Sequence, residues 1–125
     1  MNENNEDGRI SITFTRKNKS SICLHRGTVV ELGEENSFQF LINMWKHTLA
    51  LRVSHPGDKD AFDIVWDEEN SCYHVFSQAF VERIYKLCVW DNSYSYRVGG
   101  KVMHYKNEKL LVFDLGDSNK IDREE

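Results

Sequence analysis

A short pattern occurs twice in this chain of 125 residues and limits what it can fold into. Asparagine, serine and two aromatic residues in the order Asn-Ser-aromatic-x-aromatic occupy residues 36–40 and again residues 92–96. A self-similarity at a spacing of about 55 residues indicates duplication of a smaller unit. A unit of that size buries too little surface to be stable alone, so the two copies are expected to share one core.

The first copy predicts strands, a short helix and a hairpin. Residues 9–16 alternate apolar and polar side chains with the period of a half-buried strand, and residues 24–32 suit a short helix that ends before Gly33. The remaining segments are predicted to be a turn at 17–20, a short strand at 21–23 and a hairpin of strands 37–42 and 48–53.

The second copy repeats this order. Its helix, residues 78–88, has apolar residues on one face, charged residues on the other and Ser77 as its N-cap. The predicted strands are residues 61–66, 72–76, 94–98 and 110–115, with 101–105 extending the last hairpin.

These elements predict one α/β (α+β) domain made of two fused β-α-β-β halves. The first half covers residues 9–54 and the second 60–116, with mainly antiparallel strands and two short helices. Residues 1–8 and 117–125 are polar and charged and are expected to be flexible tails. The protein is expected to be a monomer or a homodimer.

The order strand, turn, short strand, helix ending in Leu-Gly, then hairpin resembles the AbrB/MazE swapped-hairpin family of DNA-binding regulators. The residues that carry the resemblance are 9–16, 17–20, 24–33 and 38–53, and Leu87 repeats the helix end in the second half. The chain departs from the family in having Gly27 inside the helix and no proline at its start. The resemblance implies a swapped-hairpin pseudo-dimer that regulates transcription.

The resemblance also implies which residues contact double-stranded DNA: Arg16, Lys17, Lys19, His25 and Arg26. Such a basic patch would neutralise phosphates, and arginine can also bind a guanine edge. The matching turn of the second half, residues 67–70, is acidic and would repel DNA. The alternative interpretation is that both turns are ordinary solvated surface.

The other class of function is a protein-binding accessory or inhibitor module that does not bind DNA. Met44 and Trp45 lie in the predicted tip of the first hairpin and are its candidate partner-binding residues, because such residues are enriched in interface cores. Trp66 and Trp90 are expected in the core.

The sequence predicts neither catalysis nor a cofactor. It contains no G-x-S-x-G, H-E-x-x-H or Walker A motif. Residues 23–25 and 72–74 each read Cys-x-His and could together form a Cys2His2 zinc site, but their offset does not match the repeat, so we predict no metal. The expected alternative to a zinc site is that the cysteines lie in the core and the histidines on the surface. The protein is predicted to be cytoplasmic, because it has three cysteines, an acidic N-terminus and no long apolar segment.

Overall fold

The computed structural model describes residues 9–16, 20–33, 37–54, 58, 61–69 and 71–121. The described chain contains two helices, α2 (Arg26–Glu31) and α3 (Gln78–Cys88). Its strands are β1 (Ser11–Thr15), β2 (Ser21–Leu24), β3 (Ser37–Asn43), β4 (Thr48–Val53), β5 (Ala61–Asp63), β6 (Val65–Asp67), β7 (Cys72–Phe76), β8 (Ser95–Tyr105) and β9 (Glu108–Ile121).

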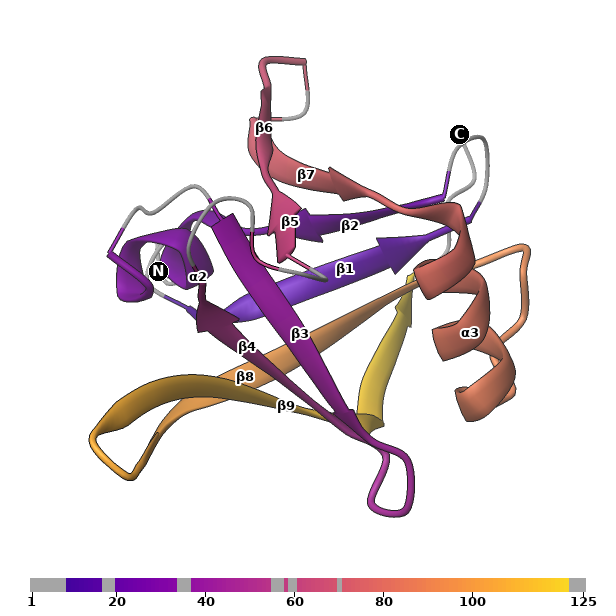
Figure 1. The fold of residues 1–125 in the computed structure, drawn as a ribbon. Helices are drawn as coiled ribbons and strands as arrows, with labels where there is room; N and C mark the ends of the chain where they lie inside the picture. Colours follow the sequence, from indigo (N-terminus) through magenta and orange to yellow (C-terminus); the bar gives the residue numbers. More distant parts are fainter. Residues whose placement is uncertain are drawn as a thin grey trace, which may run out of the picture.

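All nine strands belong to one antiparallel sheet with the order β5-β3-β4-β9-β8-β1-β2-β7-β6. The two strands at the ends of this order, β5 and β6, are separated in the chain by Ile64 alone. One bent segment therefore pairs with β3 through its first part and with β7 through its second. This arrangement nearly closes the sheet into a barrel (Figure 1).

The predicted α/β fold of two swapped-hairpin halves is wrong. The strands of the two sequence copies are mixed within the single sheet, where β1 pairs with β8 and β3 pairs with β5. Strands account for most of the described structure, and the helices have only six and eleven residues. A barrel lets short strands satisfy their backbone hydrogen bonds and bury one shared interior, which neither copy could do alone.

Many local predictions are confirmed. The helix over residues 78–88 has the predicted bounds, with Ser77 as its N-cap residue, although the serine side chain makes no capping hydrogen bond. The hairpin of β3 and β4 also forms as predicted. The predicted flexible tail is wrong for residues 117–121, because the end of β9 pairs with β8 as far as Ile121.

The interior of the barrel is a single apolar core. Side chains that are fully buried come from both sequence copies and include Ile12, Phe14, Ile22, Leu24, Phe38, Leu49, Leu51, Val98, Leu111 and Phe113. Helix α3 covers this core with Val81 and Ile84, which are also fully buried. Its Phe80 ring packs 5.1 Å from the ring of Phe40 and 5.8 Å from that of Phe62, so the helix contacts both β3 and β5.

Helix α2 is fixed against the beginning of β1. The Thr28 hydroxyl group donates a hydrogen bond to the Ser11 carbonyl oxygen (2.7 Å) and accepts one from the Ser11 amide (2.9 Å). A Cβ atom at Gly27 would collide with the backbone of Arg9, so the glycine allows the close approach. The glycine that departs from the family pattern therefore places Arg9 beside the start of α2.

Candidate functional site

The structure separates the basic residues that the sequence predicted as one DNA-binding patch. Arg16 follows β1 at one end of the β1–β2 hairpin, whereas His25 and Arg26 follow β2 at the other end. Four residues of β2 lie between these ends, a distance of about 13 Å at the usual rise of a strand. Lys17 and Lys19 lie outside the described residues.

Arg16 is engaged by other side chains of the protein. Its guanidinium group lies 3.1 Å from a carboxylate oxygen of Glu82 and donates a longer hydrogen bond of 3.4 Å to the Asn92 side chain. Both partners belong to α3 or the loop after it, and the arginine side chain is 23% exposed. Arg16 therefore holds α3 against β1, and its charge is already paired.

His25 lies in a polar cavity of about 100 Å³ at the other end of the hairpin. We call this cavity the basic pocket; it is lined by Arg9, Ser11, His25, Arg97, Gly99 and Asn119. His25 Nε2 is 2.8 Å from the Thr13 hydroxyl oxygen and 3.4 Å from a guanidinium nitrogen of Arg97. Among the described residues, two arginines and a histidine thus line this cavity, and no carboxylate does.

Such a lining is suited to an oxyanion, because guanidinium groups only donate hydrogen bonds and fit phosphate or carboxylate oxygens. Arg26 is exposed and directly follows His25 in the chain, which extends the positive surface beyond the cavity. The sequence prediction missed Arg9 and Arg97. Arg97 is brought beside His25 by the pairing of β8 with β1, in which it lies opposite Thr13.

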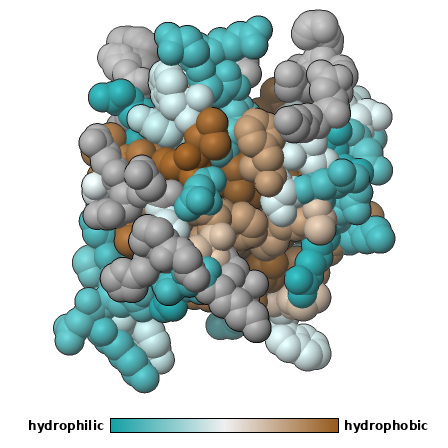
Figure 2. All heavy atoms as spheres, turned by 45° about the horizontal axis from the view of Figure 1, so that its top comes forward, coloured by the Kyte–Doolittle hydropathy of each residue, from teal (hydrophilic) through white to brown (hydrophobic). Residues whose placement is uncertain are grey.

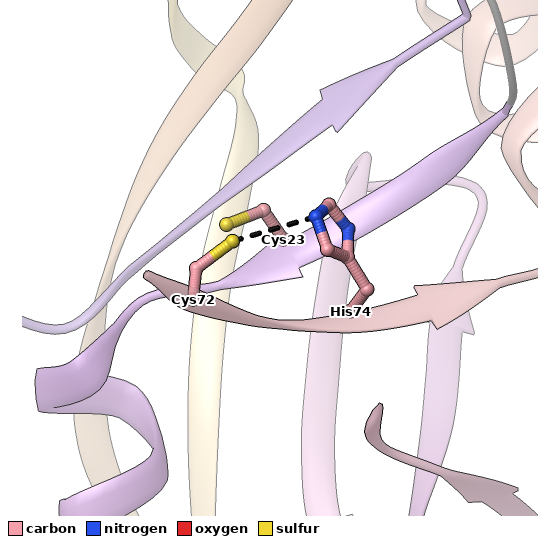
Figure 3. A group of neighbouring side chains, drawn as sticks. All are labelled: Cys23, Cys72 and His74. Carbon is pink, nitrogen blue, oxygen red and sulfur yellow. Dashed lines mark hydrogen bonds between the residues drawn. The ribbon is translucent and has the colours of Figure 1, made fainter. Parts of the chain in front are cut away.

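A second polar group lies on β2 and β7 and consists of Cys23, Cys72 and His74, which we call the sulfur–histidine cluster. The ligand atoms of all three residues lie within 4.8 Å of one another, and their side chains point toward each other (Figure 3). Cys72 Sγ is 3.5 Å from His74 Nε2, which also lies 2.9 Å from Asp67 Oδ2. Hydrogen bonding with Cys72 and burial raise the pKa of the Cys23 thiol, and the same hydrogen bond lowers the pKa of Cys72.

The tip of the β3–β4 hairpin presents the two residues predicted to bind a protein partner. The Trp45 side chain is 95% exposed and Met44 is 51% exposed. The Asn43 side-chain oxygen accepts hydrogen bonds from the amides of Trp45 (3.0 Å) and Lys46 (3.1 Å). The turn is thus held in one conformation by its own asparagine, and it directs the tryptophan away from the barrel.

Other apolar side chains reach the surface on β6 and β7. Val65, Trp66 and Phe76 are each about half exposed, at 54%, 46% and 47%. Figure 2 shows apolar surface bordered by polar side chains on the face that it presents. The prediction that Trp66 lies in the core is wrong, because β6 is at one end of the strand order and the indole stays about half exposed, 4.8 Å from the Tyr73 ring.

No family model matches this chain, and no significant match was found among curated proteins or solved structures. Within the described residues, neither helix has the length and apolar character that crossing a membrane requires. The candidate sites therefore depend on the geometry of this chain alone.

Proposed function

We propose that this protein is a non-enzymatic DNA-binding protein that contacts the phosphate backbone through the basic pocket and Arg26. The observation that carries the proposal is the convergence of Arg9, His25 and Arg97 on one cavity, which no carboxylate of the described residues lines. The three free cysteines favour a reducing compartment such as the cytoplasm.

The proposed contacts differ from those expected from sequence. His25 and Arg26 remain candidates, whereas Arg16 is paired with Glu82 and would have to give up that contact to bind a phosphate. Arg9 and Arg97 take its place. Because the net charge is −4, DNA binding would depend on this local cluster and not on attraction by the whole protein.

The test is fluorescence anisotropy of a labelled mixed-sequence duplex, titrated with the protein at low salt and again at rising salt. Neutralising phosphates releases counterions, so the affinity should fall steeply as salt is raised. The double variant Arg9→Gln with Arg26→Gln should bind at least about tenfold more weakly, with a log–log salt slope shallower by about 2.

The matched control is Lys46→Gln with Lys86→Gln, which removes the same charge from exposed positions on the hairpin tip and α3. The control should bind as the wild type does. Absence of binding at low salt, or an equal loss of affinity in the two double variants, would contradict the proposal.

A second candidate function, protein binding through the hairpin tip, is favoured by the 95% exposure of Trp45. A solvent-exposed tryptophan on an ordered turn offers a partner a large apolar side chain, and binding would cost little conformational entropy because the turn is already ordered. Under this alternative, a partner protein with an apolar pocket would receive Trp45 and the neighbouring Met44.

The measurement for this alternative is capture of partners on immobilised protein, followed by reconstitution of the complex from purified components. Trp45→Ala should abolish the reconstituted complex, and Lys46→Ala, which changes the adjacent exposed residue, should preserve it. A complex that survives Trp45→Ala would exclude the tip as its anchor.

A further inference from the structure

The sulfur–histidine cluster has a geometry set by three neighbouring strands. In the pairing of β2 with β7, Cys23 lies directly opposite His74, and Cys72 lies two residues before His74 on the same face of β7. In the pairing of β6 with β7, Asp67 lies opposite Cys72. Two thiols, an imidazole and a carboxylate are therefore neighbours on one face of the sheet.

The separations suit a tetrahedral metal ion. Zinc bonds of about 2.3 Å to sulfur and 2.0–2.1 Å to nitrogen place these atoms about 3.6 Å apart when the coordination is tetrahedral. Cys72 Sγ and His74 Nε2 are 3.5 Å apart, and Cys23 Sγ lies within 4.8 Å of both. Among these three ligands, Cys23 would need to move inward. The Asp67 carboxylate, with Oδ2 at 2.9 Å from His74 Nε2, lies outside this group and would also have to turn toward the ion.

The chemistry of the donors selects the class of metal. Thiolate and imidazole ligands favour zinc over hard ions such as magnesium and calcium, which prefer oxygen. The site is also shielded from solvent, since Cys72 is 5% exposed and the His74 side chain is 11% exposed.

We propose that Cys23, Cys72 and His74 bind one zinc ion, with the Asp67 carboxylate as the fourth ligand. Binding forms two zinc–thiolate bonds and releases the two thiol protons to solvent. The metal would join β2, β6 and β7 at the point where the barrel nearly closes, and so stabilise the end strand β6. This proposal does not depend on DNA binding.

A disulfide is the competing chemistry for the same two cysteines. Cys23 and Cys72 are diagonal neighbours across β2 and β7, and such positions are about 7–8 Å apart between Cα atoms. That exceeds the usual Cα separation of about 4.4–6.8 Å in a disulfide. A metal ion between the two sulfurs fits this register without backbone movement.

The test uses the reduced, chelator-treated full chain titrated with zinc against a chromophoric chelator, and with cobalt as a spectroscopic probe. We expect one zinc per chain, with submicromolar affinity, and cobalt spectra with thiolate charge-transfer and tetrahedral d–d bands. Cys72→Ser should weaken binding at least 100-fold, and Asp67→Asn, which keeps the side-chain shape, about tenfold with altered cobalt bands. Cys88→Ser is the matched control and should bind as the wild type does, because Cys88 lies on α3 and is not part of the cluster.

The wild-type titration keeps the proposal falsifiable even if a variant does not fold, as circular dichroism would reveal. No zinc binding at micromolar concentration, cobalt spectra without thiolate bands, or equal effects of Cys72→Ser and Cys88→Ser would overturn it. A protein that loses two hydrogens by mass spectrometry in air, and binds no cobalt when reduced, would indicate the disulfide instead and overturn it as well.

Discussion

The Thr28 hydroxyl group is the main polar contact between α2 and β1, and Thr28→Val tests whether it holds the basic pocket together. Valine has nearly the shape of threonine but cannot form a hydrogen bond. Thr28 is fully buried, and its hydroxyl group bonds both the amide and the carbonyl group of Ser11. The substitution therefore removes two hydrogen bonds and leaves the packing almost unchanged.

The expected loss of stability follows from what each Ser11 group retains. The Ser11 carbonyl oxygen still accepts a hydrogen bond from the His25 amide at 3.3 Å, so its loss is small. The Ser11 amide would instead face a methyl group, and a buried donor without a partner costs about 1–3 kcal/mol. Adding about 1 kcal/mol for the lost bond to the carbonyl group, we expect a total of about 2–4 kcal/mol.

The assay is urea denaturation followed by circular dichroism and tryptophan fluorescence. With a slope of about 2 kcal/mol per molar urea, the midpoint should fall by about 1–2 M while the slope itself stays unchanged. Thr28→Ser is the control, because it keeps the hydroxyl group and loses only a methyl group, at a cost of about 1 kcal/mol. A Thr28→Val protein within about 0.5 kcal/mol of the wild type would refute the reasoning.

Three further predictions use the same denaturation assay. A Cβ atom at Gly100 would lie 2.5 Å from the Phe113 ring, so Gly100→Ala should destabilise the protein by about 1–3 kcal/mol. Gly99→Ala is the control and should be nearly neutral, because the nearest atom to its Cβ would be 3.9 Å away. Equal losses of stability in the two variants would contradict this prediction. Tyr85→Phe should cost about 1–2 kcal/mol, because the hydroxyl group shares its one proton between two backbone carbonyl groups at 2.7 and 3.2 Å, and no change in stability would argue against this contact. Trp45→Ala should change stability by less than about 0.5 kcal/mol, and a larger loss would show that the indole packs on its own sheet.

Local structure was largely predictable because it depends on neighbouring residues. The apolar positions of α3 recur at helical spacing and Asn-Ser follows the helix, so its bounds could be found from the sequence. The hairpin of β3 and β4 was predictable for a similar reason, since its two apolar runs are separated by a short polar connection.

The assembly of these elements was not predictable, because it depends on pairings between distant segments. β1 pairs with β8, about eighty residues away, and no local pattern in either strand specifies the other. The end of β9 shows the same limit. Residues 117–121 are polar, as a flexible tail would be, but the backbone groups of β8 pair with them and make them a strand.

The candidate metal ligands show why spacing along a chain is a poor guide to a site built across strands. The offset between the two Cys-x-His sequences does not match the internal repeat, and from the sequence alone this mismatch argues against zinc. Their proximity is set instead by the antiparallel pairing of β2 with β7, which places Cys23 opposite His74 and needs no relation to the repeat. In an antiparallel pair, moving the register by one residue would turn one of the two side chains to the other face of the sheet and separate the ligands. The site therefore depends on the register, which in turn depends on the core residues Ile22, Leu24 and Val75 that face the barrel interior.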